Sequence, residues 1–191
     1  MNSSGINIRR VDGHDAEACI PGLADILIDC VEGGASVSFM LPLSHDKAIR
    51  FWKNVTDSVA RGERVLLVAE DAQGQAVGTV QLIMDQPENQ PHRADIAKML
   101  VHRRARRQGI AALLMAEIEQ VARHEGKSVL VLDTTTGGDA ERVYARAGWQ
   151  RVGSVPDYAL MPDGTLSGTT YYYKLLETKS RTAGTQSHRA S

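Results

Sequence analysis

The sequence predicts a mixed α/β fold in a single domain, with helices flanking a central sheet. Short β-forming runs alternate with longer runs whose apolar residues recur at helical spacing, in the order β-α-α-β-β-β-α-β-α-β-β. The chain has 191 residues, a length that favours one domain with a substantial core. Hydrophobic residues make up 42% and charged residues 24%, which excludes wholesale disorder. We expect residues 1–176 to form the domain.

Composition also limits the partners and the cellular location. The formal net charge is -1 and the pI is about 6.6, so a nucleic-acid partner is not expected. No apolar run approaches the ~20 residues needed to span a bilayer, and residues 1–5 lack an export signal, so we expect a cytoplasmic protein without a membrane partner. The only cysteines are Cys19 and Cys30, too few for a four-ligand zinc site, and we predict no metal. Cys30 is predicted to be a core residue.

The first third of the chain predicts a strand followed by two helices. Residues 6–11 alternate between apolar and polar or basic side chains, as in a short strand. Residues 23–31 show helical spacing, and Pro21 is expected in the first turn of that helix. Ser44 is a predicted N-cap of the second helix, and Gly62 is predicted to end it.

The remaining elements give the chain its alternating pattern. In chain order they are strands 65–70 and 76–84 joined by a hairpin turn, strand 94–101, a helix from 110 to Gly126, strand 129–132, helix 139–147, and strands 149–155 and 169–176. Residues 177–191 hold no apolar side chain larger than alanine and are predicted to be a disordered tail.

The most informative segment is the junction between strand 94–101 and the helix that begins near Gly109. The first N–H groups of a helix lack intrahelical partners and carry a partial positive charge. A pyrophosphate can accept these N–H groups, and the small residues Gly109 and Ala111 allow it to approach the backbone. Arg106 and Arg107 add positive charge. The segment therefore predicts a phosphate-binding site.

The arginine cluster of this segment also permits other interpretations; it consists of residues 103, 104, 106 and 107. A basic cluster on its own is usually a solvated loop, and a nucleic-acid patch is a further alternative. The position of the cluster between a strand and a glycine-initiated helix favours the phosphate interpretation.

The run Arg106-x-x-Gly109-x-Ala111 resembles the acyl-CoA signature of the GNAT superfamily of N-acetyltransferases. Residues 140–149 add a second likeness, because Tyr144 on a short helix precedes Gly148 and an aromatic residue. The resemblance covers residues 6–176. It implies a GNAT-like fold with a mixed, mostly antiparallel central sheet, and it implies acetyl-CoA as cosubstrate with no metal.

Four further stretches resemble the branch of the superfamily that acetylates the β-lactam toxin tabtoxin: residues 33–40, 93–101, 132–134 and 162–164. The superfamily's small-molecule resistance enzymes also include aminoglycoside acetyltransferases. This likeness implies a primary amine of a small antibiotic or toxin as the acceptor, and resistance as the outcome. A protein N-terminus or lysine as acceptor, and a non-catalytic acyl-CoA-binding module, remain alternatives. We expect a monomer or homodimer.

The resemblance also implies the roles of individual residues. Tyr144 is the expected general acid, and Asp95 and Asp133 are the candidate general bases, Asp95 standing where a glutamate is usual and therefore acting through water. A packed tyrosine and two surface or capping carboxylates are the alternatives. The expected acetyl-CoA-binding residues are Met99, Leu100, Val101, Arg106, Arg107, Gln108, Gly109, Ile110, Ala111 and Tyr144.

The acceptor site is expected at the loop that follows the first helix. The candidate substrate-binding residues are Glu32, Ser36, Phe39, Met40, Asp95 and Asp133. Phe39 and Met40 are adjacent large apolar side chains that we expect to be exposed in this loop, which favours a site lining over a plain surface loop. The acidic residues near this region, including Asp85 and Glu88, favour a cationic acceptor.

Overall fold

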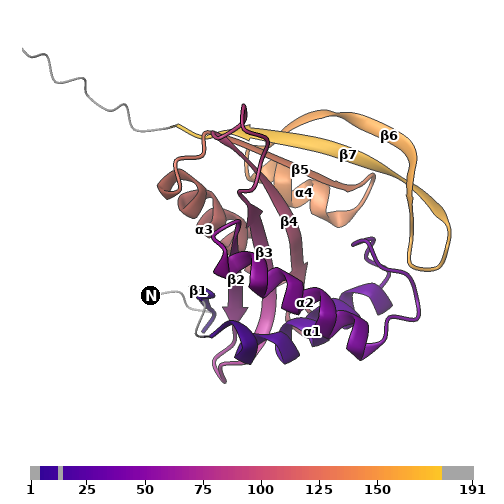
Figure 1. Cartoon of the computed structure of the whole chain (residues 1–191). Helices are drawn as coiled ribbons and strands as arrows, with labels where there is room; N and C mark the ends of the chain where they lie inside the picture. The colour runs from indigo at the N-terminus through magenta and orange to yellow at the C-terminus, as the bar shows by residue number, and fades with distance from the viewer. Residues whose placement is uncertain (1–4, 13–14, 178–191) are drawn as a thin grey trace, which may run out of the picture.

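The computed structural model describes residues 5–12 and 15–177, so most of the predicted tail lies outside the described residues. Its centre is a seven-stranded sheet in the order β1-β2-β3-β4-β5-β7-β6 (Figure 1). Every neighbouring pair of strands is antiparallel except β4 and β5, which are parallel. The predicted mixed, mostly antiparallel sheet is confirmed.

The elements follow the predicted order along the chain. They are β1 (Asn7–Arg10), α1 (Ala16–Glu32), α2 (His45–Ala60), β2 (Arg64–Glu70), β3 (Ala76–Ile83), β4 (Arg93–Val101), the 3-10 turn η1 (Arg103–Ala105), α3 (Ile110–His124), β5 (Val129–Thr135), α4 (Asp139–Arg146), β6 (Gln150–Leu160) and β7 (Leu166–Leu175).

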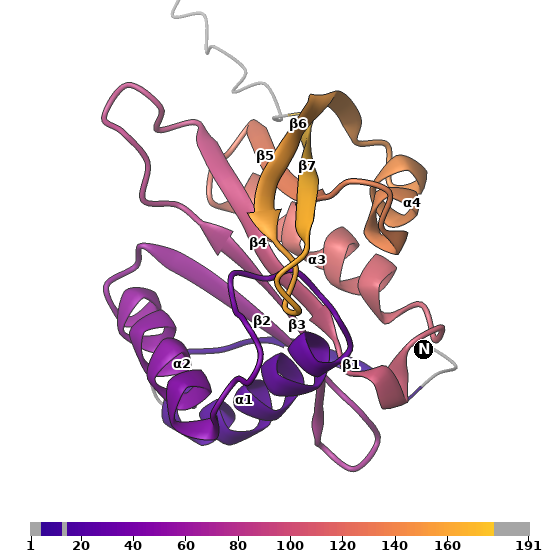
Figure 2. The ribbon, with the colours of Figure 1, turned by 90° about the vertical axis from the view of Figure 1, so that its right-hand side faces the viewer.

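Helices cover both faces of the sheet (Figures 1 and 2). Side chains of a strand alternate between faces. On β2, Val65 and Leu67 therefore pack into the core that includes α3 and α4, whereas Leu66 and Val68 pack under α1 and α2. These two cores define an α1/α2 face and an α3/α4 face, and the same alternation assigns the site residues of β4, β5 and β7 to one or the other.

Local signals predicted several boundaries correctly. The Ser44 hydroxyl accepts the Lys47 N–H at 3.3 Å, so Ser44 caps α2 as predicted. Gly62 follows this helix with φ 73°, a conformation that favours glycine. Cys30 is buried in the α1/α2 core, as expected.

The start of α1 was predicted wrongly. The helix begins at Ala16, which places Pro21 inside it rather than in its first turn. The buried side chains of Ala16, Cys19 and Ile20 extend the apolar stripe toward the N-terminus, and packing of this stripe favours the additional turn. Proline lacks an N–H, so the helix loses the hydrogen bond to the Glu17 carbonyl there.

The last two strands are longer than predicted. β6 continues past Val155 to Leu160, and β7 begins before Thr169, at Leu166. The pairing is irregular between Val155 and Ala159 and then resumes, with Leu160 opposite Leu166. Because the proline in this irregular stretch resembles a strand end in the sequence, only the pairing across the hairpin shows that β6 continues.

The parallel strands β4 and β5 are paired over part of their length only. Their described pairing runs from Arg93 opposite Val129 to Asp95 opposite Val131. β4 continues to residue 101, and a bulge interrupts its pairing with β3 where Lys98 adopts φ 50°. Beyond Asp95, residues 96, 97, 100 and 101 of β4 pair with β3 and none pairs with β5. We call this stretch, where the two parallel strands are not paired, the opening.

Candidate active site

The start of α3 lies at the C-terminal end of β4. Gly109 is the N-cap residue and adopts a left-handed conformation, with φ 79°, as the phosphate-loop interpretation requires. Within the residues described, no side chain caps this helix start. The Ile110 side chain is buried in the α3/α4 core, so this residue can offer only its backbone to a ligand. Free N–H groups beside exposed glycine match the predicted anion site.

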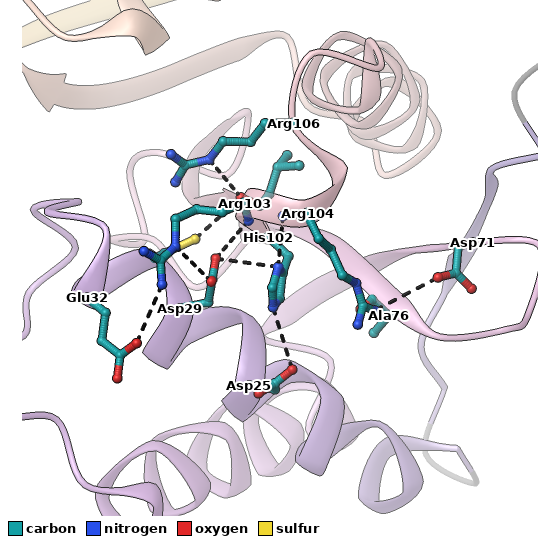
Figure 3. A network of polar contacts seen from close by, with 11 residues as sticks. Asp25, Asp29, Glu32, Asp71, Ala76, His102, Arg103, Arg104 and Arg106 are labelled. Atoms are coloured by element: carbon teal, nitrogen blue, oxygen red, sulfur yellow. Dashed lines mark hydrogen bonds and ion pairs between the residues drawn. The ribbon is translucent and has the colours of Figure 1, made fainter.

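The arginines before α3 divide into two groups. The backbone N–H of Arg103 donates to Asp29 Oδ2 at 2.7 Å, its Nε donates to Asp29 Oδ1 at 2.8 Å, and its Nη2 lies 3.5 Å from Glu32 Oε2 (Figure 3). Arg104 Nη2 donates to the Ala76 carbonyl at 3.3 Å. These two side chains hold the loop against α1 and the β2–β3 hairpin, so they contribute less charge to a ligand than the sequence indicates.

The second group is available near the helix start. Arg106 Nε donates to the Val101 carbonyl oxygen at 3.3 Å, and the Cys30 thiol donates to the same oxygen at 3.6 Å. Arg107 is exposed and adopts φ 65°, and Gln108 is also exposed. The charge that remains for a pyrophosphate therefore comes from Arg106 and Arg107, the pair named by the sequence pattern.

Glu32 was expected at the acceptor site, and its contacts differ from that expectation. Its carboxylate faces Arg103 in the loop before α3 (Figure 3). Sequence spacing could not reveal this contact, because the partners are 71 residues apart in the chain. We therefore interpret Glu32 as a partner of the loop before α3.

Replacement of Asp29 by alanine should destabilise the fold at neutral pH. Burial would raise the pKa of this carboxyl, but hydrogen bonds from Arg103 and the charge of His102 outweigh burial and lower it. A depressed folded-state pKa adds stability above the unfolded value near ~3.9, and that stability is lost as the pH falls through the folded value. In denaturant unfolding, the free energy of unfolding of Asp29→Ala should be lower than that of wild type at pH 7, and this difference should shrink below about pH 4.

Asp25 offers a matched control for this variant. Its carboxylate is largely exposed and lies 3.7 Å from His102 Nε2. Asp25→Ala should change stability much less than Asp29→Ala, because exposed pairs contribute little. Equal losses in the two variants at pH 7 would contradict the anchoring role of Asp29.

Asp95 and Asp133 lie on the same face of the sheet, on either side of the opening. Val131 is paired with Asp95, and Asp133 follows two residues later in β5, so both carboxylates share the α1/α2 face. Leu130 and Leu132 alternate with them into the α3/α4 core.

The two carboxylates have different partners. Asp95 forms an ion pair with Arg93, and the Gln86 amide donates to its Oδ2 at 3.1 Å. Asp133 is exposed and accepts the Thr169 hydroxyl at 2.9 Å. Both carboxylate oxygens of Asp95 therefore have partners, whereas among the described residues Asp133 has a contact at Oδ2 and is open to an acceptor. This contrast favours Asp133 over Asp95 as the base.

Tyr144 approaches from the opposite face. Its ring is buried in the α3/α4 core, 6.0 Å from the Trp149 ring and 5.8 Å from the Tyr172 ring. Burial raises the pKa of Tyr144, and the charge of Asp133 raises it further. The phenol therefore stays protonated at neutral pH, as a proton donor must.

The loop between α1 and α2 is tied to the β6–β7 hairpin. The Ser36 hydroxyl donates to the Leu160 carbonyl at 3.3 Å, and the Leu41 N–H donates to the Pro162 carbonyl at 3.0 Å. Figure 2 shows the tip of this hairpin beside the loop. Two segments more than a hundred residues apart thus meet over the α1/α2 side of the sheet.

Phe39 and Met40 differ in their environment. The sequence indicates that both are exposed in the loop, but Phe39 is only 9% exposed and packs edge-on against Phe51 at 5.2 Å. Met40 is 38% exposed. The prediction of an exposed Phe39 was wrong, because α2 supplies an aromatic partner that the loop sequence cannot reveal. Phe39 anchors the loop, and Met40 remains available for an acceptor.

Sequence reasoning missed several polar residues on the same face. Lys98 Nζ donates to the Ser38 hydroxyl at 3.1 Å. The Tyr171 hydroxyl donates to the Tyr158 hydroxyl at 2.9 Å, and this bond, with burial, raises the pKa of Tyr171 to about 12. A lysine within a largely apolar strand was the available signal for Lys98. The tyrosines had none, because β6 was predicted to end before Tyr158.

Comparison with known families agrees with this arrangement. The family described as "Acetyltransferase (GNAT) family" matches residues 31–149. The chain belongs to the GNAT acetyltransferase family. One curated relative, an uncharacterized N-acetyltransferase encoded in the hisH-hisA intergenic region of Azospirillum brasilense, is 32% identical over 113 residues. That match covers 58% of this chain and 65% of the relative.

Solved structures share the fold of this GNAT protein. An N-acetyltransferase from Staphylococcus aureus Mu50 has a TM-score of 0.72 at 19% identity, covering 91% of this chain and 100% of that one. A ribosomal-protein-alanine N-acetyltransferase from Brucella melitensis has a TM-score of 0.73 at 24% sequence identity, and the match covers 89% of this chain and 99% of that one. The yncA protein from Salmonella typhimurium, solved with its cofactor acetyl-CoA, has a TM-score of 0.72 at 17% sequence identity. That match covers 95% of this chain and 99% of the yncA chain.

The family match encloses most of the site. Gly109, Asp95, Asp133 and Tyr144 all lie between residues 31 and 149, whereas the β6–β7 hairpin follows the matched region. Among the helices of residues 5–12 and 15–177, none is both long and apolar enough to cross a membrane.

Proposed function

We propose that this GNAT protein transfers an acetyl group from acetyl-CoA to a primary amine, with both substrates bound at once. The observation that carries this proposal is the end of β4–β5 pairing at Asp95 and Val131, next to the uncapped start of α3. The thioester and the amine can meet in this opening, and the N–H groups of α3 can hold phosphates beside it.

The chain offers suitable partners for acetyl-CoA, which supplies an activated acetyl thioester. The backbone at residues 107–111 can hold the pyrophosphate, and Arg106 and Arg107 can neutralise its charge. The backbone of Met99, Leu100 and Val101 can pair with the pantetheine arm as an added strand would. Within this segment, Arg106 and Cys30 already contact the Val101 carbonyl, so the other backbone groups carry the proposed pairing.

The transfer requires proton movements on opposite faces of the sheet. Asp133, directly or through water, accepts the proton of the acceptor's ammonium group, and a nitrogen–carbon bond to the acetyl group then forms. The carbon–sulfur bond breaks, and Tyr144 donates its proton to the leaving thiolate. The second proton, which the attacking nitrogen still carries, then passes through solvent to the phenolate and restores Tyr144. A backbone N–H of β4 near the bulge would stabilise the developing negative charge on the thioester oxygen.

Asp133→Asn should lower kcat/KM about tenfold at pH 7 and less at higher pH. The loss shrinks because an amine with a pKa near ~10.4 arrives increasingly deprotonated as the pH rises, and the base is then not needed. The pH–rate profiles of Asp133→Asn and Asp95→Asn should separate the base from the acid that Arg93 already neutralises. A larger loss in Asp95→Asn would assign the base to Asp95 instead.

The acceptor is proposed to be a small amine-bearing antibiotic or toxin, such as a tabtoxin-like β-lactam or an aminoglycoside, so that acetylation confers resistance. The hydrogen bonds from the α1–α2 loop to the β6–β7 hairpin support a small acceptor. A folded protein's terminus or lysine would need an open approach across this contact. A non-catalytic acyl-CoA-binding module would have no use for Asp133 and Tyr144 on opposite faces.

Release of free thiol from acetyl-CoA tests these alternatives directly. The assay should use aminoglycosides, β-lactam toxins, polyamines and peptides as acceptors, with the acetylated product identified by mass spectrometry. Turnover of small amines in preference to peptides would support the proposal. Acetyl-CoA binding without turnover of any acceptor would favour a binding module, and exclusive turnover of peptides would favour a protein acceptor.

A further inference from the structure

An unusual set of hydrogen-bond donors lies on the α1/α2 face. Arg64 Nη1 donates to the side-chain amide oxygen of Gln81, Oε1, but Arg64 Nε and Gln81 Nε2 are buried without a hydrogen-bond partner among the described residues. Gln81 is 0% exposed. Buried donors without acceptors are costly and rare in native proteins, so two at neighbouring positions indicate a missing acceptor.

Lys98 places a further donor on this face. Its ammonium donates to the Ser38 hydroxyl and lies 5.9 Å from the centre of the Phe51 ring. Within the described part of the chain, neither Lys98 nor Arg64 forms an ion pair. Burial lowers the pKa of Lys98, the charge of Asp133 raises it and that of Arg64 lowers it further, so all three charges lie near one another.

The strand register shows why these side chains gather. Arg64 and Leu66 share a face of β2, Gln81 lies opposite Leu66, and Ala97 lies opposite Gln81. The bulge at Lys98 follows directly. We define Arg64, Gln81 and Lys98 as the basic cluster.

Two carboxylates, those of Asp95 and Asp133, lie on the same face of the sheet as the basic cluster. Asp95 is neutralised by Arg93, whereas Asp133 is exposed and, among the described residues, accepts the Thr169 hydroxyl. Within that part of the chain, this face therefore holds the Asp133 carboxylate near two cations that form no ion pair. A ligand that complements it carries a positive group and a negative group close together.

We propose that the basic cluster binds a carboxylate of the acceptor, and that the acceptor is therefore an amino acid or a compound with the same amine-and-carboxylate pattern. The inference rests on the proposed acetyl transfer. Asp133 faces the reacting amine, and Lys98 and the orphaned donors of Arg64 and Gln81 face the carboxylate. This arrangement disfavours polycationic acceptors such as aminoglycosides and polyamines, in contrast to the cationic acceptor that the acidic residues of the sequence favour.

The test compares the L-amino acids with their α-amides as acceptors, because each pair differs only in the carboxylate. Wild-type protein should acetylate at least one free amino acid. For that pair, the ratio of kcat/KM between acid and amide should fall about 10- to 100-fold in Lys98→Met, the effect of one lost charge-assisted hydrogen bond. Lys98→Arg, which keeps the charge, should restore most of the ratio.

Lys53→Met provides the matched control, because Lys53 is an exposed lysine of α2. It should leave the ratio at the wild-type value. Arg64→Met should lower the ratio as Lys98→Met does, which separates loss of the subsite from an accidental effect at one position. Unfolding midpoints of all variants identify any that fail to fold, and Lys98→Arg and Arg64→Met then carry the test.

The outcomes separate this inference from the proposed function. Acetylation of amides or polyamines without a preference for free acids would leave the proposed function standing and overturn the carboxylate subsite. If no acceptor is turned over, the proposed function fails. Calorimetric titration of coenzyme A-saturated protein with amino acids and their amides then tests the carboxylate subsite by binding alone. Binding of free amino acids but not their amides, lost in Lys98→Met, would support the subsite, and equal binding of both would refute it.

Discussion

Gly109→Leu should raise the dissociation constant for acetyl-CoA about a hundredfold or more. Gly109 adopts φ 79°, which costs a residue with a Cβ about 1–2 kcal/mol. The added side chain would also stand where a pyrophosphate approaches the start of α3. Loss of two charge-assisted hydrogen bonds of about 1.5 kcal/mol each corresponds to roughly a hundredfold weaker binding. Calorimetric titration with acetyl-CoA measures this directly.

Gly126 provides the control at the opposite end of the same helix. It follows the C-terminus of α3 with φ 73°, and an added Cβ would meet nothing within 4 Å at either glycine. Gly126→Leu therefore imposes the same kind of backbone strain without approaching the phosphate site. The two variants should lose similar stability, and only Gly109→Leu should lose acetyl-CoA binding. Unchanged binding in Gly109→Leu would remove the helix start as the phosphate site.

Tyr144→Phe should lower kcat about a hundredfold or more while changing the KM for acetyl-CoA little. The hydroxyl is the only group removed, and loss of a positioned proton donor typically costs 10²–10⁴ in rate, by order of magnitude. Because burial raises the pKa of Tyr144, its ionisation should add no alkaline limb to the wild-type pH–rate profile below its ordinary value near ~10. Steady-state kinetics over pH 6 to about pH 9.5 test both statements.

Tyr172→Phe is the matched control for this variant. Its ring lies 5.8 Å from that of Tyr144 in the same core and also carries a hydroxyl. The two substitutions remove the same atom from neighbouring buried rings, so a packing effect would appear in both. Equal rates in Tyr144→Phe and wild type would show that Tyr144 only packs between helix and sheet.

The order of the elements and the glycine-initiated start of α3 could be predicted from the sequence. Apolar periodicity distinguishes strands from helices, and caps such as Ser44 and turns such as Gly109 depend on residues close together in the chain. The family resemblance identified Tyr144, Asp95 and Asp133, and strand alternation then places the two acids on one face. These features are local or carried by a motif, which is why one sequence suffices for them.

The partners of the side chains were decided only by the tertiary structure. Glu32 faces Arg103, Phe39 is buried against α2, and Arg93 neutralises Asp95. Apolar periodicity indicates that a side chain faces the core, but it does not name the residue it meets there. Pairing across β2, β3 and β4 brought the basic cluster together from positions 64, 81 and 98, and the physical reason is strand register, which no local pattern in the chain encodes.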